Sequence, residues 1–364
     1  MNEVTKIDGI GSSVRRTEDK KFLTGKGRYT DDINRPGQVQ AYFLRSDVAH
    51  AEIKSIDTKA AQSAPGVVGV FTGADIAADK VGGPICGWVV PCRDGSSTKE
   101  PPHPLLAQGK VRFVGDAVAV VVAETMEQAK SAAELIDVDY NELTPVVDFV
   151  NADKGAQIHE EVPNNCYFDW ELGDESATNK AIESAAKVVK LSVRNNRLVP
   201  NAMEPRSALA EYDSLDESYT LHTTSQNPHL TRLVLAAFMF AIPESKLRVI
   251  APDVGGGFGS KIYVYIEEAV CVWASKKIGR PVKWTADRTQ AFLTDCHGRD
   301  HVNDVQLALD ENNKIKRIRY YHEKICKVLL INPINYESLI YFTPLPRTSY
   351  HSTSIYYIIN VICI

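Results

Sequence analysis

The sequence predicts an α+β fold on three observations. Its 364 residues are 44% hydrophobic and 24% charged, which is the composition of a globular protein. Amphipathic stretches with helical spacing and β-branched apolar runs both occur along the chain. They do not follow one another in the long, regular strand–helix rhythm of a doubly wound sheet, which argues against a nucleotide-binding fold of that type. Two or three domains fit the length.

The first half of the chain contains a strand–helix–strand unit. A β-branched run over 65–72 precedes it, and the longer run over 110–124 predicts a buried strand. A helix is expected to begin after Thr125, because Gln128 lies three residues further on in a capping-box pattern. Alternating apolar residues over 137–143 predict the strand that completes the unit.

The second half mixes helices and strands. Helical spacing of apolar residues predicts helices over 177–186, 229–241 and 263–278. Gly279 and the proline that follows it are expected to end the last of these. β-Branched segments predict strands over 187–194, 208–212, 219–224 and 246–250.

These elements divide the chain into five predicted parts. They are an N-terminal extension over 1–19, an α+β domain over 20–148, a polar linker over 149–166, a second domain over 167–324 and a tail over 325–364. The tail differs in composition from the rest of the chain. Only three of its 40 residues are charged, and 14 of the 40 are Ile or Tyr. Either a buried terminal hairpin or a segment translated out of the parent reading frame would explain it.

Charge and cysteine content exclude several classes. The 41 basic and 46 acidic residues give a net charge of −5, which does not favour nucleic acid as a partner. Seven scattered cysteines without a C-x-x-C pair predict reduced thiols. The polar N-terminus resembles no signal peptide and no apolar run predicts a membrane span, so we expect a cytoplasmic protein.

The glycine-rich run APDVGGGFGSK over 251–261 is the strongest local signal for chemistry. It lies between a predicted strand and a predicted helix, where glycines let backbone N–H groups approach a polar ligand. A Walker loop would need glycine at Ser260 and a hydroxyl residue at Ile262, and the spacing of a dinucleotide fingerprint fails as well. A tight turn without a ligand is the alternative interpretation.

Two weaker signals remain. Gln226, in TTSQNPH at another strand-to-helix junction, either bonds to nearby backbone or offers an uncharged N–H donor to an oxo ligand or a carbonyl oxygen. His297 and His301 have the i, i+4 spacing of zinc ligands, but Gly298 argues against the helix that such a pair needs, so no direct metal ligand is predicted. The polar groups of 28–32 and 203–206 are interpreted as turn and strand-end networks.

Taken in order, five segments closely resemble the molybdopterin-binding large subunit of the xanthine dehydrogenase, aldehyde oxidase and aerobic carbon monoxide dehydrogenase family. The segments are RRTEDKKFLTGKGRYTDDI, HPLLAQGKVRFVGDAVAVVVAETMEQAKSAAELIDVDYNELTPVVD, NNRLVPNAMEPRSALAEY, TTSQNPH and APDVGGGFGSK. The resemblance covers about Gly11 to Lys324. It implies that 20–148 is an α/β-hammerhead domain and that 167–324 is an incomplete first molybdopterin-binding domain.

The resemblance also implies site residues, cofactors and partners. Gln226 matches the glutamine that hydrogen-bonds the apical oxo group of molybdenum, and Gly256, Gly257, Phe258 and Gly259 match the loop that flanks the metal. The cofactor would be molybdenum-molybdopterin in its cytosine dinucleotide form. Family members oxidise a small-molecule substrate with oxygen from water, and electrons pass to an iron–sulfur small subunit and an FAD-binding medium subunit.

Two departures from the family shape these expectations. Purine-oxidising members carry an acidic residue where this chain has Ile262, which favours an aldehyde, a small carbonyl or nitrogen compound, or carbon monoxide over xanthine. Large subunits of the family are also about twice as long. We therefore expect a truncated product that is inactive alone; the alternative is a non-catalytic hammerhead fragment or a partner in subunit assembly.

Overall fold

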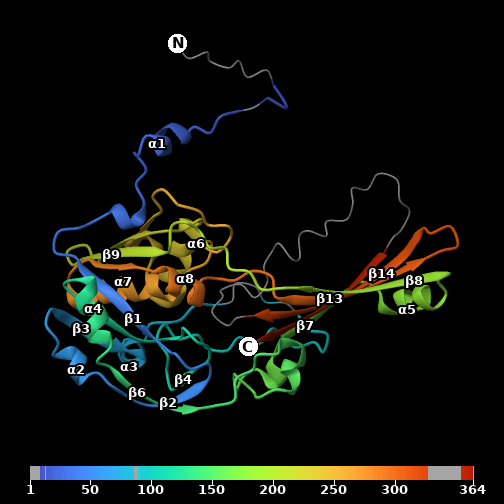
Figure 1. Ribbon diagram of the computed structural model, residues 1–364, viewed down its shortest axis with the longest axis horizontal. Coiled ribbons are helices and arrows are strands. Elements are labelled where there is room, and N and C mark those ends of the chain that lie inside the picture. Colours follow the sequence, from blue (N-terminus) through green and yellow to red (C-terminus); the bar gives the residue numbers. More distant parts are fainter. Residues whose placement is uncertain (1–8, 13, 86–88, 90, 327–353, 364) are drawn as a thin grey trace.

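A computed structural model describes residues 9–12, 14–85, 89, 91–326 and 354–363 (Figure 1). It confirms the α+β class, with helices packed on three sheets. The largest sheet has seven strands in the order β11-β10-β9-β12-β1-β5-β3. Their bounds are β1 Val39–Arg45, β3 Val67–Thr72, β5 Ala117–Ala123, β9 Ser207–Asp213, β10 Ser218–Thr223, β11 Leu247–Ile250 and β12 Val282–Thr285.

This seven-stranded sheet combines strands from both predicted domains. β1 pairs with β5 of its own half and with β12 of the other half, so backbone hydrogen bonds continue across the predicted division. All seven residues of β5 are buried, because side chains on both of its faces meet apolar neighbours. Val120 and Val122 face one core, and Val121 faces another with helix α4 (Met126–Ala133).

Helix α7 (Ile266–Ile278) covers the first of these cores. Every residue from Ile266 to Ser275 is buried against strands β9, β10 and β12. The helix ends at Gly279, which has a φ of 69°, as the sequence predicts. Its start was predicted at 263, which is wrong, because Tyr265 is still extended.

The predicted strand–helix–strand unit is partly confirmed. Thr125 and Gln128 exchange side-chain-to-backbone hydrogen bonds of 3.2 and 3.1 Å and cap α4. The run over 110–124 is not one strand, because a turn at 112–116 separates β5 from β4 (Lys110–Val111). The two pieces enter different sheets: β4 joins β2 (Ala51–Asp57) and β6 (Asp137–Glu142) in a sheet of three strands.

The third sheet has the order β7-β15-β14-β13-β8 and extends away from the main body with α5 against it (Figure 1). Its strands are β7 Cys166–Leu172, β8 Lys187–Asn195, β13 His301–Leu309, β14 Ile315–Cys326 and β15 Ser354–Cys363. β15 belongs to the predicted tail and pairs in parallel with β14, so these two strands do not form a hairpin. The tail residues 327–353 lie outside the described residues.

The remaining helices are short. They are α1 Asp19–Leu23, α2 Lys59–Gln62, α3 Gly73–Ala78, α5 Glu175–Glu183, α6 Pro228–Leu233 and α8 Arg288–Thr294. The helix predicted over 229–241 is α6, followed by a π-helical turn over Val234–Met239. Among the described residues, no helix has the length and apolar character that crossing a membrane requires. None of Cys92, Cys166, Cys271 and Cys296 takes part in a disulfide bond.

The segment predicted as a linker, 149–166, is exposed at most of its positions but folds on itself around a few buried side chains. Asn165 is buried and donates to the carbonyls of Ala152 and Ala156, each at 2.8 Å, and accepts from the Ile158 amide at 2.9 Å. This one asparagine bonds to three backbone groups of the segment and so holds its fold.

Because His159 in the same segment is buried, we predict that the free energy of unfolding depends on pH. It is 1% exposed, and neither ring nitrogen has a hydrogen-bond partner. Burial lowers its pKa from 6.5 to about 3, so the folded chain keeps the ring neutral while the unfolded chain protonates it. Stability should fall as pH drops through 6.5, by about 1.4 kcal/mol per pH unit once the pH is below about 6.

The comparison of wild type with His159→Phe isolates this contribution. Urea denaturation at about pH 7, 6 and 5 should show a steeper loss in the wild type, because phenylalanine does not titrate. Asp116, whose pKa burial raises to about 6, acts with the opposite sign but is common to both proteins. Parallel pH profiles for the two proteins would contradict the prediction.

Candidate functional site

Sheet topology brings the two strongest predicted signals together. β10 and β11 are parallel neighbours, so their carboxyl ends lie at the same edge of the sheet. The turn that carries Gln226 follows β10, and the glycine loop over 251–261 follows β11. The backbone N–H of Gln226 donates to the carbonyl of Lys261 at 2.8 Å and joins the two loops.

The Gln226 side chain has a defined orientation. Its amide oxygen accepts from the backbone N–H groups of Gly259 at 3.0 Å and Lys261 at 3.2 Å. An amide has one acceptor oxygen and one donor NH₂ group, so this arrangement leaves the NH₂ group for other partners. Gln226 is an exposed residue, and its remaining chemistry is therefore that of a neutral hydrogen-bond donor.

Gly257 leaves the space that this glutamine occupies. A Cβ atom at Gly257 would lie 2.3 Å from Oε1 and 2.4 Å from Cδ of Gln226, inside the range that real Cβ atoms avoid. Gly256 and Gly259 have φ values of 97° and 88°, which L side chains rarely adopt. The loop is thus built from glycine for close approach and for backbone conformation.

Phe258 stands out from the loop. Its φ of 52° is left-handed, which is uncommon for a bulky residue, and 74% of the residue is exposed. Residues held in such conformations gather at ligand sites, where the surrounding structure imposes them. The aromatic ring of Phe258 lies against Gly256, where an added Cβ atom would come within 2.9 Å of the ring.

Three of the loop's own amides donate to side chains of this protein. Gly255 donates to Glu204, and Gly259 and Lys261 donate to Gln226. Helix α7 does not offer its N-terminus either, because the Glu268 carboxylate caps the backbone of Tyr265 at 2.9 Å. Part of the cradle of backbone N–H groups expected from the sequence is thus satisfied internally, and the Gln226 side chain adds a donor of its own.

Glu204 bonds to Lys261, the last residue of the loop, and neither was predicted as a site residue. Lys261 is 1% exposed, and its Nζ donates to the Glu204 carbonyl at 2.8 Å and to the Glu204 carboxylate at 3.0 Å. Burial lowers the pKa of the Lys261 ammonium, and the Glu204 charge partly offsets this. Glu204 belongs to the 203–206 segment, which was predicted only as a polar network at a strand end.

Arg206, two residues further on, is the centre of a buried charge network. It bonds to Asp295 at 2.6 Å and to Glu267 at 2.8 Å, and its guanidinium lies 3.7 Å from the centroid of the Tyr265 ring. Arg45 also pairs with Glu267 at 2.6 Å. Burial would raise the pKa of Glu267, but the two arginines outweigh it and hold the pKa at about 2.

The histidines with zinc-like spacing have other surroundings. The Nε2 atom of His297 lies 3.0 Å from the Phe292 carbonyl oxygen, and His301 is in strand β13. Within the part of the chain that the structure describes, no group of three or more His, Cys, Asp or Glu side chains is arranged to hold a metal ion.

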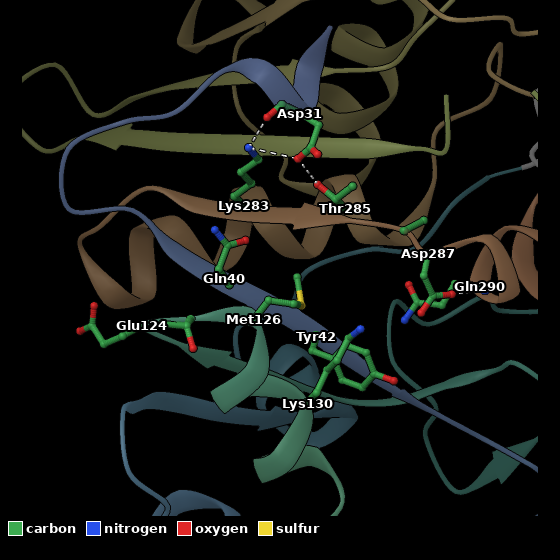
Figure 2. Close-up of a pocket in the computed structure, with 12 residues that line it drawn as sticks. Asp31, Gln40, Tyr42, Glu124, Met126, Lys130, Lys283, Thr285, Asp287 and Gln290 are labelled. Atoms are coloured by element: carbon green, nitrogen blue, oxygen red, sulfur yellow. Dashed lines mark hydrogen bonds and ion pairs between the residues drawn. The ribbon is translucent and has the colours of Figure 1, made fainter. Parts of the chain in front are cut away.

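A polar pocket of about 450 Å³ lies apart from the Gln226 loops, between α4 and β12 (Figure 2). Lys283 and Thr285 point toward Asp31, whose Oδ1 lies 3.1 Å from the Lys283 ammonium and accepts from the Thr285 hydroxyl at 2.8 Å. Lys130 lies over the ring of Tyr42, 5.8 Å from its centroid. Asp31 is therefore part of a polar network, as predicted for 28–32.

Two family descriptions match the chain. The α/β-hammerhead domain of aldehyde oxidase and xanthine dehydrogenase matches residues 24–144, and the molybdopterin cofactor-binding domain matches residues 158–324. The second range contains both Gln226 and the glycine loop.

Curated relatives are similar over most of this chain. The carbon monoxide dehydrogenase large chain of Afipia carboxidovorans is 36% identical over 332 residues, which cover 86% of this chain and 39% of the relative. The nicotine 6-hydroxylase large subunit of Paenarthrobacter nicotinovorans is 36% identical over 313 residues, covering 85% of this chain and 37% of the relative. The chain thus spans under two fifths of the length of these relatives.

Solved structures have the same fold. Quinoline 2-oxidoreductase from Pseudomonas putida 86 superposes with a TM-score of 0.82 at 33% identity, covering 97% of this chain and 44% of the other. The Cu,Mo carbon monoxide dehydrogenase superposes with a TM-score of 0.82 at 31% identity, covering 98% of this chain and 45% of the other.

Proposed function

Because the chain belongs to the family of molybdopterin-binding large subunits of xanthine dehydrogenase, aldehyde oxidase and carbon monoxide dehydrogenase, we propose that it supplies the hammerhead and molybdenum-facing loops of a molybdenum hydroxylase. The observation that carries the proposal is the orientation of Gln226. Its oxygen is held by two backbone N–H groups, so its NH₂ group is available to an oxo ligand.

The residues around Gln226 fit such a cofactor. Bound molybdenum-molybdopterin would supply a two-electron oxidation in which water provides the oxygen. Gln226 would donate a hydrogen bond to the cofactor, Gly257 leaves room for that glutamine, and the exposed ring of Phe258 would cover one side. None of these side chains is charged, so a developing negative charge at the site would be stabilised by neutral donors.

We propose a substrate that is an aldehyde, a small carbonyl or nitrogen compound, or carbon monoxide. Ile262 follows Lys261 of the loop, and its side chain has no polar atom with which to hydrogen-bond a purine. Two relatives at 36% identity are named for carbon monoxide dehydrogenase and nicotine 6-hydroxylase, whereas relatives named for xanthine dehydrogenase are 30 to 31% identical.

The complete enzyme is proposed to be cytoplasmic and to contain the cytosine dinucleotide form of the cofactor, with an iron–sulfur subunit and an FAD subunit as electron carriers. Relatives are described as large chains or as a subunit of a dehydrogenase complex, which supports partners of this kind. Since this chain spans under two fifths of the length of such relatives, we also propose that residues 1–364 by themselves do not turn over substrate.

The test compares Gln226→Ala with the wild type in the holoenzyme. Holoenzyme purified from cells supplied with molybdate, through a tag on a full-length large subunit that contains these residues, should contain molybdenum, iron and flavin and should reduce an electron-accepting dye with one of the proposed substrates. Gln226→Ala should lower kcat about tenfold or more, because one donor to the cofactor is lost.

The matched control is Gln62→Ala on α2, where the glutamine bonds only to Thr58 within its own turn. It should leave kcat, molybdenum content and flavin content unchanged. A wild-type complex that contains iron and flavin but no molybdenum would contradict the proposal and would favour the non-catalytic, subunit-assembly alternative.

A further inference from the structure

We infer that Glu204 is a positioning residue that fixes the glycine loop and, through it, the orientation of Gln226. The functional consequence rests on the proposed function, but the structural claim does not. Glu204 contacts the loop at both of its ends. Its Oε2 accepts from the Gly255 N–H at 2.7 Å and from the Lys261 ammonium at 3.0 Å, and its backbone N–H donates to the Gly255 carbonyl at 3.1 Å.

Close packing makes this attachment specific at Gly255. A Cβ atom there would lie 2.5 Å from Cβ of Glu204, so only glycine lets the loop come near enough for the hydrogen bonds to form. The loop therefore approaches Glu204 with its backbone, and the carboxylate replaces water as the acceptor for the Gly255 amide.

Charge makes the attachment strong at Lys261. Its side chain is 1% exposed, and a buried ammonium without a counter-charge is strongly destabilising. The described partners of its Nζ atom are the carbonyl and the carboxylate of Glu204. Moving Lys261 away from Glu204 would therefore cost more than any single neutral hydrogen bond of the loop.

The same lysine carries the contact to Gln226. The Lys261 backbone N–H donates to the Gln226 amide oxygen at 3.2 Å, and the Lys261 carbonyl accepts from the Gln226 backbone at 2.8 Å. Glu204 has no described hydrogen bond to Gln226 itself. It acts through Lys261, whose side chain is fixed on one side of the loop and whose backbone holds the glutamine on the other.

The experiment measures amide hydrogen exchange of the 364-residue chain without cofactor. Glu204→Gln leaves Lys261 without its counter-charge, so amides of 255–261 should exchange about tenfold faster or more, while those of 266–278 in α7 keep wild-type rates. The neutral pair Glu204→Gln with Lys261→Gln removes both charges and should restore protection to within about threefold of the wild type.

Glu244→Gln, in the exposed Arg232–Glu244 pair on the surface, is the matched control and should leave exchange in 255–261 unchanged. Wild-type exchange of the loop in Glu204→Gln would overturn the inference. So would equal acceleration in the loop and in α7, or a neutral pair no better protected than the single variant.

In the holoenzyme, Glu204→Gln should lower kcat about tenfold with little change in KM, because the cofactor-facing amide is misaligned while substrate binding elsewhere is retained. Unchanged kcat together with faster loop exchange would overturn the functional consequence and leave the proposed function intact. A wild-type enzyme that lacks molybdenum would instead contradict the proposed function. Amide hydrogen exchange would then still show whether Glu204 fixes the glycine loop.

Discussion

Replacing Gly257 with alanine is expected to lower kcat of the holoenzyme about tenfold or more, as Gln226→Ala does, while leaving the fold intact. The new methyl group would lie 2.3 Å from the amide oxygen of Gln226, so the glutamine must move. It can move, because the atoms in the way belong to a flexible side chain. In moving, it loses its hydrogen bonds from Gly259 and Lys261, and with them the orientation of its NH₂ group.

The control for this prediction is Gly109→Ala. Gly109 has a φ of 71° and open space around its Cβ position, so alanine there adds backbone strain far from the site. It should lower thermal stability slightly and leave kcat unchanged. Turnover of Gly257→Ala within about twofold of the wild type would show that the position of Gln226 does not matter for the reaction.

The parts of this fold that depend on residues close together in the sequence could be predicted from the sequence. The cap of α4 at Thr125 and the stop of α7 at Gly279 follow from residues within one turn, and both are confirmed. The division of the 110–124 run could not be read locally. β4 holds only Lys110 and Val111, and its pairing with β2 rather than with a strand of the large sheet separates it from β5.

At the candidate site too, the sequence predicts local features but not contacts between distant residues. Gln226 and the glycine loop each lie after a predicted strand, and the parallel pairing of β10 with β11 brings them to one edge. Glu204 and Lys261 are 57 residues apart in the sequence. Charged side chains usually lie on the surface, so the sequence alone would place each of them in solvent. Nothing in either local sequence indicates that the two are buried together. Long-range ion pairs of this kind need the tertiary fold.

Arg206→Met is expected to destabilise the 364-residue chain by about 3 to 5 kcal/mol, the largest effect on stability among these variants. Asp295 would lose its counter-charge, and Glu267 would retain only Arg45. Both carboxylates are buried, so water cannot replace the guanidinium. Chemical denaturation at about pH 7 measures the loss as a lower midpoint with an unchanged m-value.

The exposed pair of Arg280 with Glu124 provides the comparison. Its hydrogen bonds of 2.6 and 2.8 Å are as short as those of Arg206, but 33% of the arginine side chain is exposed, so Arg280→Met should cost less than about 1 kcal/mol. Equal losses for the two variants would show that burial is not what makes the Arg206 network strong.

The pH dependence gives a second measurement on the same variant. The arginines hold the folded pKa of Glu267 at about 2, below its ordinary value of 4.5, so this carboxylate stabilises the wild type above pH 4.5 and loses its effect as pH falls through about 2. Without Arg206 its pKa must rise, because burial then weighs more. The variant will protonate Glu267 at a higher pH than the wild type does. The difference in unfolding free energy between the two should therefore shrink on acidification, and a constant difference from about pH 7 to pH 4 would mean that the guanidinium acts through packing rather than charge.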